Sequence, residues 1–345
     1  MTKMIKMSLV AAVAVAGFTT SASAMDTSYT GKVYVENHAT SVNDGQTVTG
    51  YDIDFDVKAT TKINDNFSAV VGVQADADTK DNVAASASAV TMDKANINYA
   101  GNGLTVKFGR QAINTPTTDG ETVEGILATY GVAKGITLAA AHFGNQSIAE
   151  GAVAGQDAHA VAVLGSMSGV NFQLWNVGVA GHSVNNTLVV GANVAGIALG
   201  ARYATTDFEA GTDKDGSTMI LSAAGKAGTV GLSAAYLVNG EDNAAFTSDA
   251  SSANTAELVE FNAQNAADTK AFILGVSAPM TSTLSASVKY GSADIGANNS
   301  ISEVVLQLTN KFAKSLTGTV RYADYTGVTS DTDQTQLRAD MTYKF

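Results

Sequence analysis

The sequence predicts an all-β protein, a transmembrane antiparallel β-barrel of 18 strands, with 16 as the alternative count. Three observations predict this fold class: apolar residues recur with a period of two, connections alternate between long and short, and aromatic residues gather at the strand ends. No apolar run after residue 24 approaches the roughly 18 residues that a membrane-spanning helix needs. A chain of this kind would therefore cross a membrane with strands.

The first element is a targeting segment, residues 1–24, which we expect to be removed. It opens with two lysines, continues with the apolar run 8–18 and ends on the small residues Ala22-Ser23-Ala24. The alternative is a buried N-terminal helix, which the order of charge, apolar run and cleavage site disfavours. We expect the remainder, residues 25–345, to form one barrel domain.

The strands follow from strict alternation of apolar and polar residues. The runs Tyr51–Lys58, Leu104–Phe108 and Ile197–Tyr203 alternate without a fault. A helical period of 3.6 would scatter these apolar positions over several faces. In order, we expect strands at 27–37, 47–58, 67–76, 90–99, 104–110, 125–132, 136–143, 158–166, 170–180, 187–194, 197–204, 218–226, 230–238, 269–278, 283–290, 302–312, 316–323 and 334–345.

The connections between these strands alternate in length. Short ones such as Gly101-Asn102-Gly103 and Ala195-Gly196 alternate with long ones such as Asn145–Asp157, Thr205–Ser217 and Asn239–Asp268. An outer-membrane barrel is connected in this way, with tight periplasmic turns at one end and large extracellular loops at the other. An even strand count places both termini on the short-turn side.

Charged strand residues avoid the apolar face. Taking the apolar face as the lipid side places the charges in a wet lumen, whereas a soluble sandwich would bury the apolar face in a core. Periodicity alone does not separate these two cases. The lumen-facing charges would be Lys32, Asp52, Asp54, Asp56, Lys58, Lys107, Arg202, Lys289, Glu303, Arg321, Arg338 and Asp340, among which Asp52, Asp54 and Asp56 form an acidic ladder.

Aromatic residues favour the barrel, because they lie at both ends of the strands with small and aliphatic residues between them. Two such belts match the girdles at the two membrane interfaces. A general preference of tyrosine and phenylalanine for strands would not sort them to the ends. The belts are Phe108, Tyr203, Tyr236, Tyr290 and Tyr322 at the long-loop end, and Tyr29, Phe67, Tyr99, Tyr130 and Phe345 at the short-turn end.

Composition excludes several other classes of function. The net charge of −12 argues against nucleic-acid binding, and the absence of cysteine excludes disulfides and thiolate metal sites. No His-Glu-x-x-His, Gly-x-Ser-x-Gly or phosphate-binding glycine motif occurs, so we predict neither an enzyme nor a cofactor. The segment Asp213–Ser217 begins like a calcium loop but lacks the later glutamate. We interpret it as a solvated loop, and bound calcium stays an open alternative.

Several segments resemble known porins. The segment Phe108–Thr115, followed by Thr118-Asp119-Gly120, resembles the strand and inward-folding third loop of Gram-negative porins. This resemblance implies a third loop folded into the lumen. The segments that resemble the Campylobacter-type major outer membrane porin family are Ile5–Ala12, Gly135–Ala141, Gln173-Leu174-Trp175 and Leu337–Phe345.

The resemblance to that family implies an 18-stranded, homotrimeric general porin in the outer membrane of a Gram-negative bacterium. The ending, with Tyr343 and the terminal Phe345, resembles the C-terminal signal by which such barrels are recognised for insertion. The implied partners are small hydrophilic solutes and ions, outer-membrane lipid and lipopolysaccharide, and the barrel-assembly machinery.

The leading functional hypothesis is a water-filled channel for passive diffusion with a mild cation preference. The constriction would be the third long loop, Gln111–Val123, which carries Asp119 and Glu121, with Glu124 directly after it. Acids on this loop would face bases on the pore wall, and the pair would set a field across the channel. The alternative for any one charge is plain solvation. The predicted bases opposite the loop are Lys107, Arg202, Arg321 and Arg338.

Two other functions stay open on the sequence alone. One is a surface adhesin or structural outer-membrane protein that uses the stretch Asn239–Asp268 to bind a host or a neighbouring cell. The other is a substrate-specific porin, whose transport would saturate with one solute.

Overall fold

The fold was obtained as a computed structural model. It describes residues 26–42, 47–80, 90–116, 118–146, 156–209, 214–245, 258, 266–296, 299–329 and 332–345, with backbone alone for 78–80, 119–121 and 145–146. The predicted targeting segment, residues 1–24, lies outside these ranges. Within the described residues, no helix is long and apolar enough to span a membrane.

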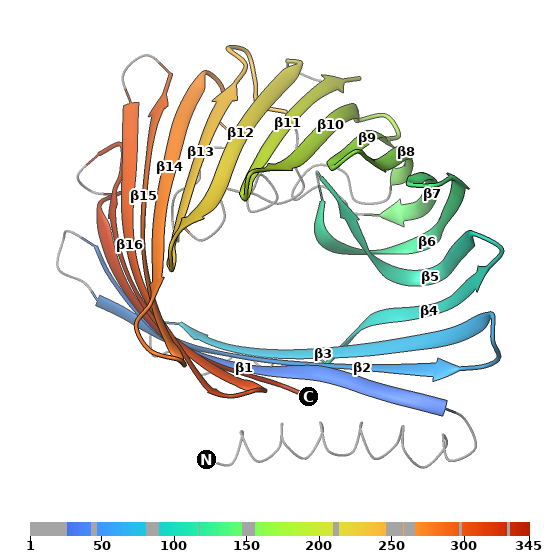
Figure 1. The fold of residues 1–345 in the computed structure, drawn as a ribbon, viewed down its shortest axis with the longest axis horizontal. Coiled ribbons are helices and arrows are strands. Elements are labelled where there is room, and N and C mark those ends of the chain that lie inside the picture. Colours follow the sequence, from blue (N-terminus) through green and yellow to red (C-terminus); the bar gives the residue numbers. More distant parts are fainter. Residues whose placement is uncertain are drawn as a thin grey trace.

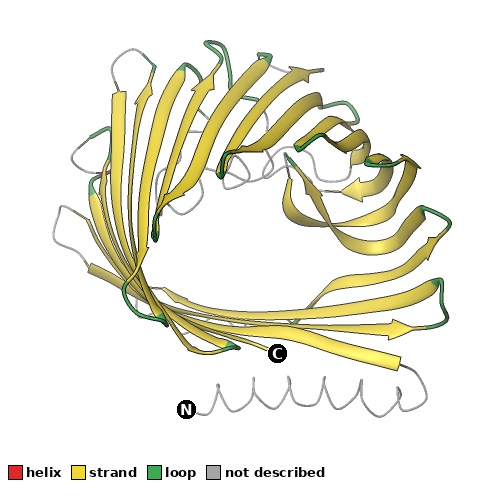
Figure 2. Ribbon diagram, viewed as in Figure 1, coloured by secondary structure: helices red, strands yellow, loops and turns green. Residues whose placement is uncertain are grey.

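The chain forms one closed sheet of 18 antiparallel strands, which confirms the predicted fold class and excludes the count of 16. Each strand pairs with its neighbours in sequence, and β1 also pairs with β18, so the ring has no free edge (Figure 1). Figure 2 shows strands joined by short turns at one end of the barrel. The strands are β1 Asp26–Val42, β2 Thr47–Lys62, β3 Phe67–Lys80, β4 Thr91–Gly101, β5 Leu104–Thr115, β6 Thr118–Ala133, β7 Ile136–Gln146, β8 Gln156–Met167, β9 Val170–Val179, β10 Ser183–Val194, β11 Ile197–Phe208, β12 Gly216–Ala227, β13 Val230–Asn239, β14 Thr269–Pro279, β15 Leu284–Ile295, β16 Asn299–Ala313, β17 Leu316–Thr326 and β18 Gln334–Lys344.

Most strands occur where the alternation predicts them, but several are longer at the long-loop end. Strand β1 ends at Val42 instead of residue 37, and β6 begins at Thr118 instead of residue 125. The β1 extension carries Thr40 and Ser41, and the β6 extension carries Thr118 and Thr122. Beyond the membrane a strand needs no apolar face, so the alternation fades although the backbone ladder continues.

Three of the short turns, at 102–103, 168–169 and 195–196, have positive φ angles at two consecutive residues. Asn102 and Gly103 have φ values of 52° and 78°, and Ala195 and Gly196 have values of 52° and 84°. Two left-handed residues in a two-residue hairpin match the twist of the flanking strands. Glycine in the second position adopts this conformation without steric strain.

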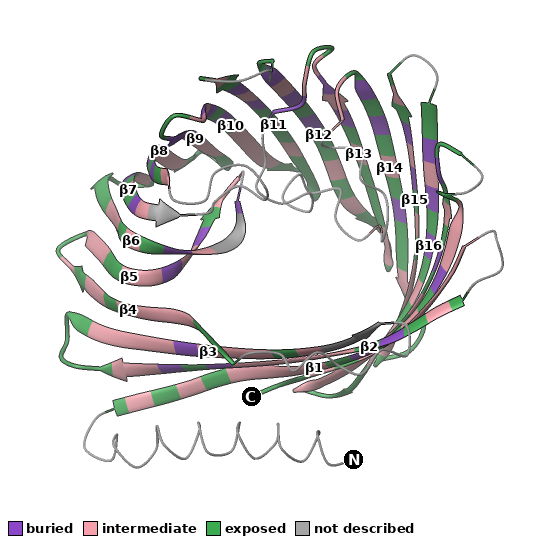
Figure 3. Cartoon of the chain, turned by 180° about the vertical axis from the view of Figure 1, so that it is seen from behind, coloured by how far each residue is buried: buried purple, intermediate pink, exposed green. Residues whose placement is uncertain are grey.

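The apolar face of the sheet points outward. All five aromatics predicted at the long-loop end are exposed, with Phe108 at 64%, and so are Phe67, Tyr130 and Phe345 at the short-turn end. In Figure 3 exposed residues alternate along the strands with residues that are partly or fully buried. A single closed sheet with apolar side chains on its outside is a membrane barrel and has no core between two layers.

The C-terminal residue takes part in closing the ring. The Phe345 N–H donates to Gly31 O at 3.1 Å, and the Gly31 N–H donates to Phe345 O at 3.0 Å. The Phe345 ring stacks with Tyr343, with ring centroids 6.0 Å apart. The predicted C-terminal assembly signal therefore lies at the β1–β18 seam, and its role in insertion stays a prediction.

We predict that Gly31→Ala weakens this seam. A Cβ at Gly31 would lie 2.4 Å from Asp56 O and 2.5 Å from the Phe345 ring, so the strand or the ring must shift. Overpacking of this kind costs about 1–3 kcal/mol, and we expect a lower urea midpoint for unfolding in lipid vesicles. The control is Gly191→Ala, whose Cβ would meet nothing closer than Leu199 O at 3.7 Å. Equal midpoints for the two variants would contradict the prediction.

Candidate functional site: the charged wall of the lumen

The lumen wall is chemically divided into two halves. Strand register identifies the lumen face as the face opposite the exposed aromatics. On β6–β15 the described lumen-facing residues are mainly small or apolar, such as Ala139, Ala160, Ala204 and Ala271, all of which are buried. We call the lumen face of β1–β5 and β16–β18 the charged wall. Its described ionisable residues include Lys32, Glu36, His38, Asp52, Asp54, Asp56, Lys58, Asp76, Lys94, Lys107, Glu303, Arg321, Arg338 and Asp340.

The predicted acidic ladder lies on this charged wall. Asp52, Asp54 and Asp56 occupy alternate positions of β2, and their cross-strand partners on β1 are Glu36, Tyr34 and Lys32, respectively. Residues two apart on a strand are spaced by nearly 7 Å on the same face. The Lys32 Nζ lies 3.2 Å from Asp56 Oδ2, so one end of the ladder is ion-paired. The three acids thus form a column along one strand, and their role in the lumen stays a prediction.

The basic residues that we expect on the wall opposite the third loop lie on different parts of that wall. Arg338 on β18 and Arg321 on β17 are direct cross-strand partners, two and three strands away from β2 across the seam. Lys107 lies on β5 at the other edge of the charged wall. Arg202 lies on β11, on the half with few charges. The structure therefore brings Arg321 and Arg338 beside the acidic ladder and separates them from Arg202.

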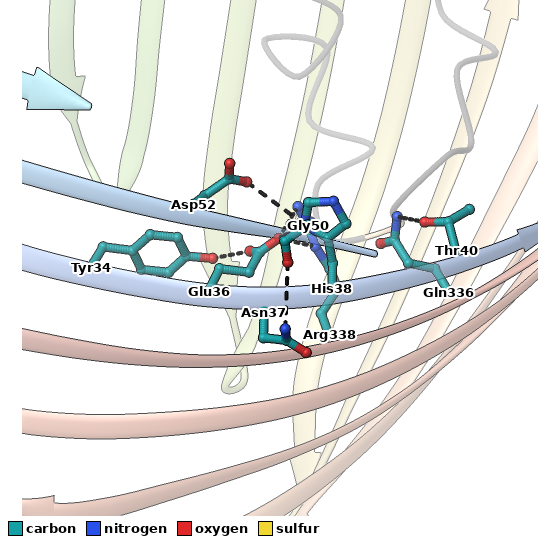
Figure 4. A network of polar contacts seen from close by, with 9 residues as sticks. All are labelled: Tyr34, Glu36, Asn37, His38, Thr40, Gly50, Asp52, Gln336 and Arg338. Atoms are coloured by element: carbon teal, nitrogen blue, oxygen red, sulfur yellow. Dashed lines mark hydrogen bonds and ion pairs between the residues drawn. The ribbon is translucent and has the colours of Figure 1, made fainter. Parts of the chain in front are cut away.

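A polar network around Glu36 links three strands across the seam (Figure 4). Glu36 on β1 is 2% exposed. Both Nε and Nη2 of Arg338 lie 2.7 Å from Glu36 Oε1, and the Tyr34 hydroxyl donates to Glu36 Oε2. The neighbouring His38 Nδ1 lies 3.4 Å from the same Glu36 Oε1 and 3.8 Å from Asp52 Oδ2. The network therefore holds two carboxylates, a guanidinium and an imidazole within one cluster.

Sequence reasoning did not single out Glu36, His38 or Tyr34. The sequence does contain an indication of their position, because these residues share one face of β1 with Lys32, which the alternation assigns to the lumen. Polar side chains are expected at every such position, so the pattern alone does not rank them. Their importance follows from the β1–β18 register, which no local sequence motif encodes.

The predicted third loop is largely strand. Residues 111–115 and 118–123 extend β5 and β6, and the ladder between them has an irregularity between Ala112 and Asn114. A bulge of this kind bends a hairpin, and Figures 1 and 3 show the joined ends of β5 and β6 bending into the ring. We call this bent end the hairpin tip.

Apolar packing holds the hairpin tip against the inner wall. Ile113 of β5 and Val123 of β6 form a buried cluster with Phe143 of β7, Ala158 of β8 and Val179 of β9. The cluster runs across five neighbouring strands, β5 to β9, on the lumen face. The inward fold expected of the third loop is therefore present, built from a strand hairpin.

We predict that Ile113→Asn releases the hairpin tip and increases single-channel conductance in planar bilayers. Ile113 is 6% exposed, and an asparagine there loses apolar burial and buries an amide, which together destabilise the contact by about 3 kcal/mol. The control is Ile63→Asn in the exposed β2–β3 turn, where Ile63 is 51% exposed. Unchanged conductance in the Ile113 variant would show that the tip does not restrict the channel.

The predicted constriction acids have different outcomes. The side chains of Asp119 and Glu121 lie outside the described part, so their role stays a prediction. Glu124 shares the face of β6 that carries the exposed Ile126, and it pairs with Arg110, whose Nη1 lies 3.2 Å from Glu124 Oε1. This register places Glu124 on the outward face, in contrast to its predicted place in the constriction, because Val123 takes the lumen-facing position.

The stretch 239–268, assigned to binding in the adhesin hypothesis, is described at 239–245, 258 and 266–268. Leu258 packs against a buried, lumen-facing cluster that includes Ile220, Leu237 and Ala271. Part of this connection therefore lies inside the barrel. At its start, Asp242 contacts Lys214 of the preceding loop, and this contact raises the pKa of the Lys214 ammonium, which stays cationic at neutral pH.

Comparisons with known proteins concern the fold. No family model matches the chain, and no curated protein matches it in sequence. Among solved structures, it resembles OccK5 (OpdH) of Pseudomonas aeruginosa, with a TM-score of 0.74 at 11% identity over 92% of this chain and 98% of that one. It also resembles OpdQ of that bacterium, with a TM-score of 0.76 at 12% identity over 93% and 99%. The third example is the outer membrane protein OprD, also from P. aeruginosa, with a TM-score of 0.72 at 14% identity over 93% and 94%.

These likenesses support the porin fold. They do not support the more specific resemblance to the Campylobacter-type porins, because the similar structures reported above come from Pseudomonas. The short segments that carried that resemblance lie mostly in regular strands, where the barrel itself imposes alternation.

Proposed function

We propose that the protein is an outer-membrane porin, a water-filled channel for passive diffusion of small hydrophilic solutes and ions, with a preference for cations. The observation that carries this proposal is a closed barrel with an apolar outside and a column of ionisable side chains along one side of its lumen. Ionisable side chains in such numbers would not be buried in a dry protein core. They fit the wall of a pore, which is in contact with water. The likeness in fold to the outer membrane protein OprD supports the same location.

The cation preference is inferred from the charges of the wall. The acidic ladder is joined by Asp76 on β3 and Asp340 on β18, which face the same side. Rows of fixed negative charge raise the local concentration of cations, and carboxylate rings select cations in other channels. Arg338 and Lys32 neutralise Glu36 and Asp56 in part, so the preference is expected to be mild.

Recordings in planar bilayers test this proposal. The purified protein should form open channels, and in a tenfold KCl gradient its reversal potential should have the sign of cation preference. Current should rise in proportion to the salt concentration, and the flux of an uncharged solute in proportion to the concentration of that solute. A barrel that inserts without conducting would contradict the proposal, and a reversal potential of anionic sign would contradict its selectivity.

Targeting and assembly belong to the same proposal. The segment 1–24 would direct export and be removed, and the terminal Phe345 would be read by the barrel-assembly machinery. The barrel would then sit among lipid and lipopolysaccharide as a homotrimer. Unheated electrophoresis of outer-membrane fractions, with chemical cross-linking, tests the trimer, and N-terminal sequencing of the mature chain tests the cleavage after residue 24.

A substrate-specific channel is the second candidate, and one feature of the lumen favours it. A recess of about 790 Å³ lies on the lumen side of β12–β16, where Ser233, Ser277 and Ser287 stand with Lys226 and Lys289 among its lining. Hydroxyl groups and ammonium groups together provide donors for a polar solute. Flux that saturates with one class of solute would favour this candidate, whereas linear flux favours general diffusion. The inward position of Leu258 gives the adhesin hypothesis no support.

We predict that Asp119→Asn with Glu121→Gln lowers the cation preference if these acids face the constriction. The hairpin tip, whose backbone pairs Asn114 with Asp119, folds into the lumen, so charges there would act close to passing ions. The expected result is a reversal potential closer to zero at low salt, where screening is weak. An unchanged reversal potential would show that these two acids do not determine selectivity.

A further inference from the structure

The network around Glu36 contains the donor set of a metal site. Glu36, His38 and Asp52 each offer one ligand atom, and these atoms all lie within 4.8 Å of one another. Glu36 and His38 are two positions apart on β1, and Asp52 on β2 is the cross-strand partner of Glu36. The ladder between the two strands holds them in fixed register. We propose that Glu36, His38 and Asp52 bind a divalent transition-metal ion, such as Zn²⁺, in the wall of the channel.

The distances match those of a coordination shell. His38 Nδ1 lies 3.4 Å from Glu36 Oε1 and 3.8 Å from Asp52 Oδ2. Zinc binds imidazole nitrogen and carboxylate oxygen at about 2.0–2.1 Å, so two ligands of a tetrahedral site lie roughly 3.3 Å apart. One His38–carboxylate pair already has this spacing, and the other needs a shift of about half an ångström. A water molecule from the channel would complete the shell.

A second observation points to a ligand at the same place. His38 Nδ1 is buried and makes no hydrogen bond, and the whole His38 side chain is only 12% exposed. A buried polar atom without a hydrogen bond is costly, and most such atoms in proteins have a partner. A lone pair aimed between two carboxylates is stabilised by a cation placed among them. The imidazole thus has the environment of a metal ligand.

The surrounding groups orient the carboxylates. Arg338 holds Glu36 Oε1 with two nitrogens at 2.7 Å, and Tyr34 donates to Oε2, so the carboxylate cannot rotate freely. Partners of this kind commonly fix metal ligands from outside the coordination shell. Arg338 also lowers the negative charge of the site, so we expect moderate affinity. The acids Asp54 and Asp340 on neighbouring positions keep the local charge negative.

The donor set selects the class of metal. One imidazole nitrogen with two carboxylate oxygens suits Zn²⁺, Cu²⁺ or Ni²⁺, whereas Ca²⁺ and Mg²⁺ prefer oxygen ligands alone. A bound dication would place positive charge beside the acidic ladder. It should therefore reduce the cation current through the channel.

The chain allows a clean test, because it has only four histidines. The first variant is His38→Gln, and the matched control is His142→Gln with His159→Gln and His182→Gln, which keeps His38 alone. Both are purified without a histidine tag, freed of metal with EDTA and titrated with ZnCl₂ in equilibrium dialysis. We expect wild type and the control to bind about one Zn²⁺ per chain, and His38→Gln to bind at least tenfold more weakly.

Bilayer recordings give a second readout on the same proteins. Micromolar ZnCl₂ should reversibly reduce the current of wild type and of the triple control, EDTA should restore it, and MgCl₂ should have no comparable effect. The His38→Gln channel should conduct without responding to ZnCl₂. If His38→Gln fails to fold, Asp52→Asn provides the same test, because Asp52 is 32% exposed and lies at the edge of the network.

Two results would overturn the proposal. One is equal Zn²⁺ binding by wild type and His38→Gln, and the other is loss of binding in the triple control. Open channels that ignore ZnCl₂ would contradict the metal site while leaving the porin function intact. Absence of conductance in every variant would contradict the porin function, and the dialysis result would still decide the metal site.

Discussion

A channel in which Asp52, Asp54 and Asp56 are all changed to asparagine is expected to lose most of its cation preference. These acids form one column on the charged wall, and asparagine keeps their size while removing three negative charges. Fixed charges in a pore act on passing ions through the local potential. We expect the cation-to-anion permeability ratio to fall about threefold, measured as a reversal potential in a tenfold KCl gradient.

Ionic strength provides an internal check on this result. The screening length is about 30 Å at 0.01 M salt and about 3 Å at 1 M. The difference between wild type and the triple variant should therefore be largest in dilute KCl and small near 1 M. An effect that does not depend on salt would indicate a change in pore shape instead of a change in potential.

A matched control carries the same change in net charge on the other face of the sheet. Asp207, Asp294 and Asp324 are exposed and share their strand faces with the outward residues Tyr203, Tyr290 and Tyr322. Changing these three acids to asparagine should leave the reversal potential close to that of wild type. If the outward triple variant shifts the potential as much as the lumen triple variant, selectivity depends on the overall charge of the barrel and not on the ladder.

The ladder itself could be predicted from the sequence because a membrane barrel leaves the chain little freedom. Lipid requires an apolar residue at every second position, and closure of the ring satisfies the backbone groups of each strand. The run Tyr51–Lys58 therefore fixes both the strand and the face on which Asp52, Asp54 and Asp56 lie. The exposed aromatics of the two belts follow from the same constraint.

The parts that could not be predicted depend on contacts between residues far apart in the chain. The Arg338–Glu36 pair joins residues separated by 302 positions, and its geometry follows from the seam register. The hairpin tip was assigned to a loop because residues 111–123 do not alternate cleanly, and its fold depends on Phe143 and Val179 of other strands. The outward face of Glu124 follows from the register of β6, which no apolar pattern sets beyond the membrane.

Removing the guanidinium from the seam network is expected to destabilise the barrel strongly. Glu36 is 2% exposed, and Arg338 contacts its Oε1 with two nitrogens at 2.7 Å. Arg338→Gln would leave a buried carboxylate without its cation, which costs about 3–5 kcal/mol where no other charge compensates. His38, whose Nδ1 lies 3.4 Å from the same oxygen, can compensate in part, so we expect about 3 kcal/mol. Urea unfolding in lipid vesicles measures this, with the fluorescence of Trp175, the single tryptophan of the chain, as the signal.

The double variant Arg338→Gln with Glu36→Gln separates the charge from the packing. It removes both members of the pair and leaves two amides that can hydrogen-bond, so no unpaired charge stays buried. Replacement of both partners is often close to neutral, whereas loss of one is not. We therefore expect the double variant to be more stable than Arg338→Gln alone, although it carries one more substitution. If the two variants unfold at the same urea concentration, the seam depends on packing around Arg338, and the buried charge of Glu36 contributes little to closing the ring.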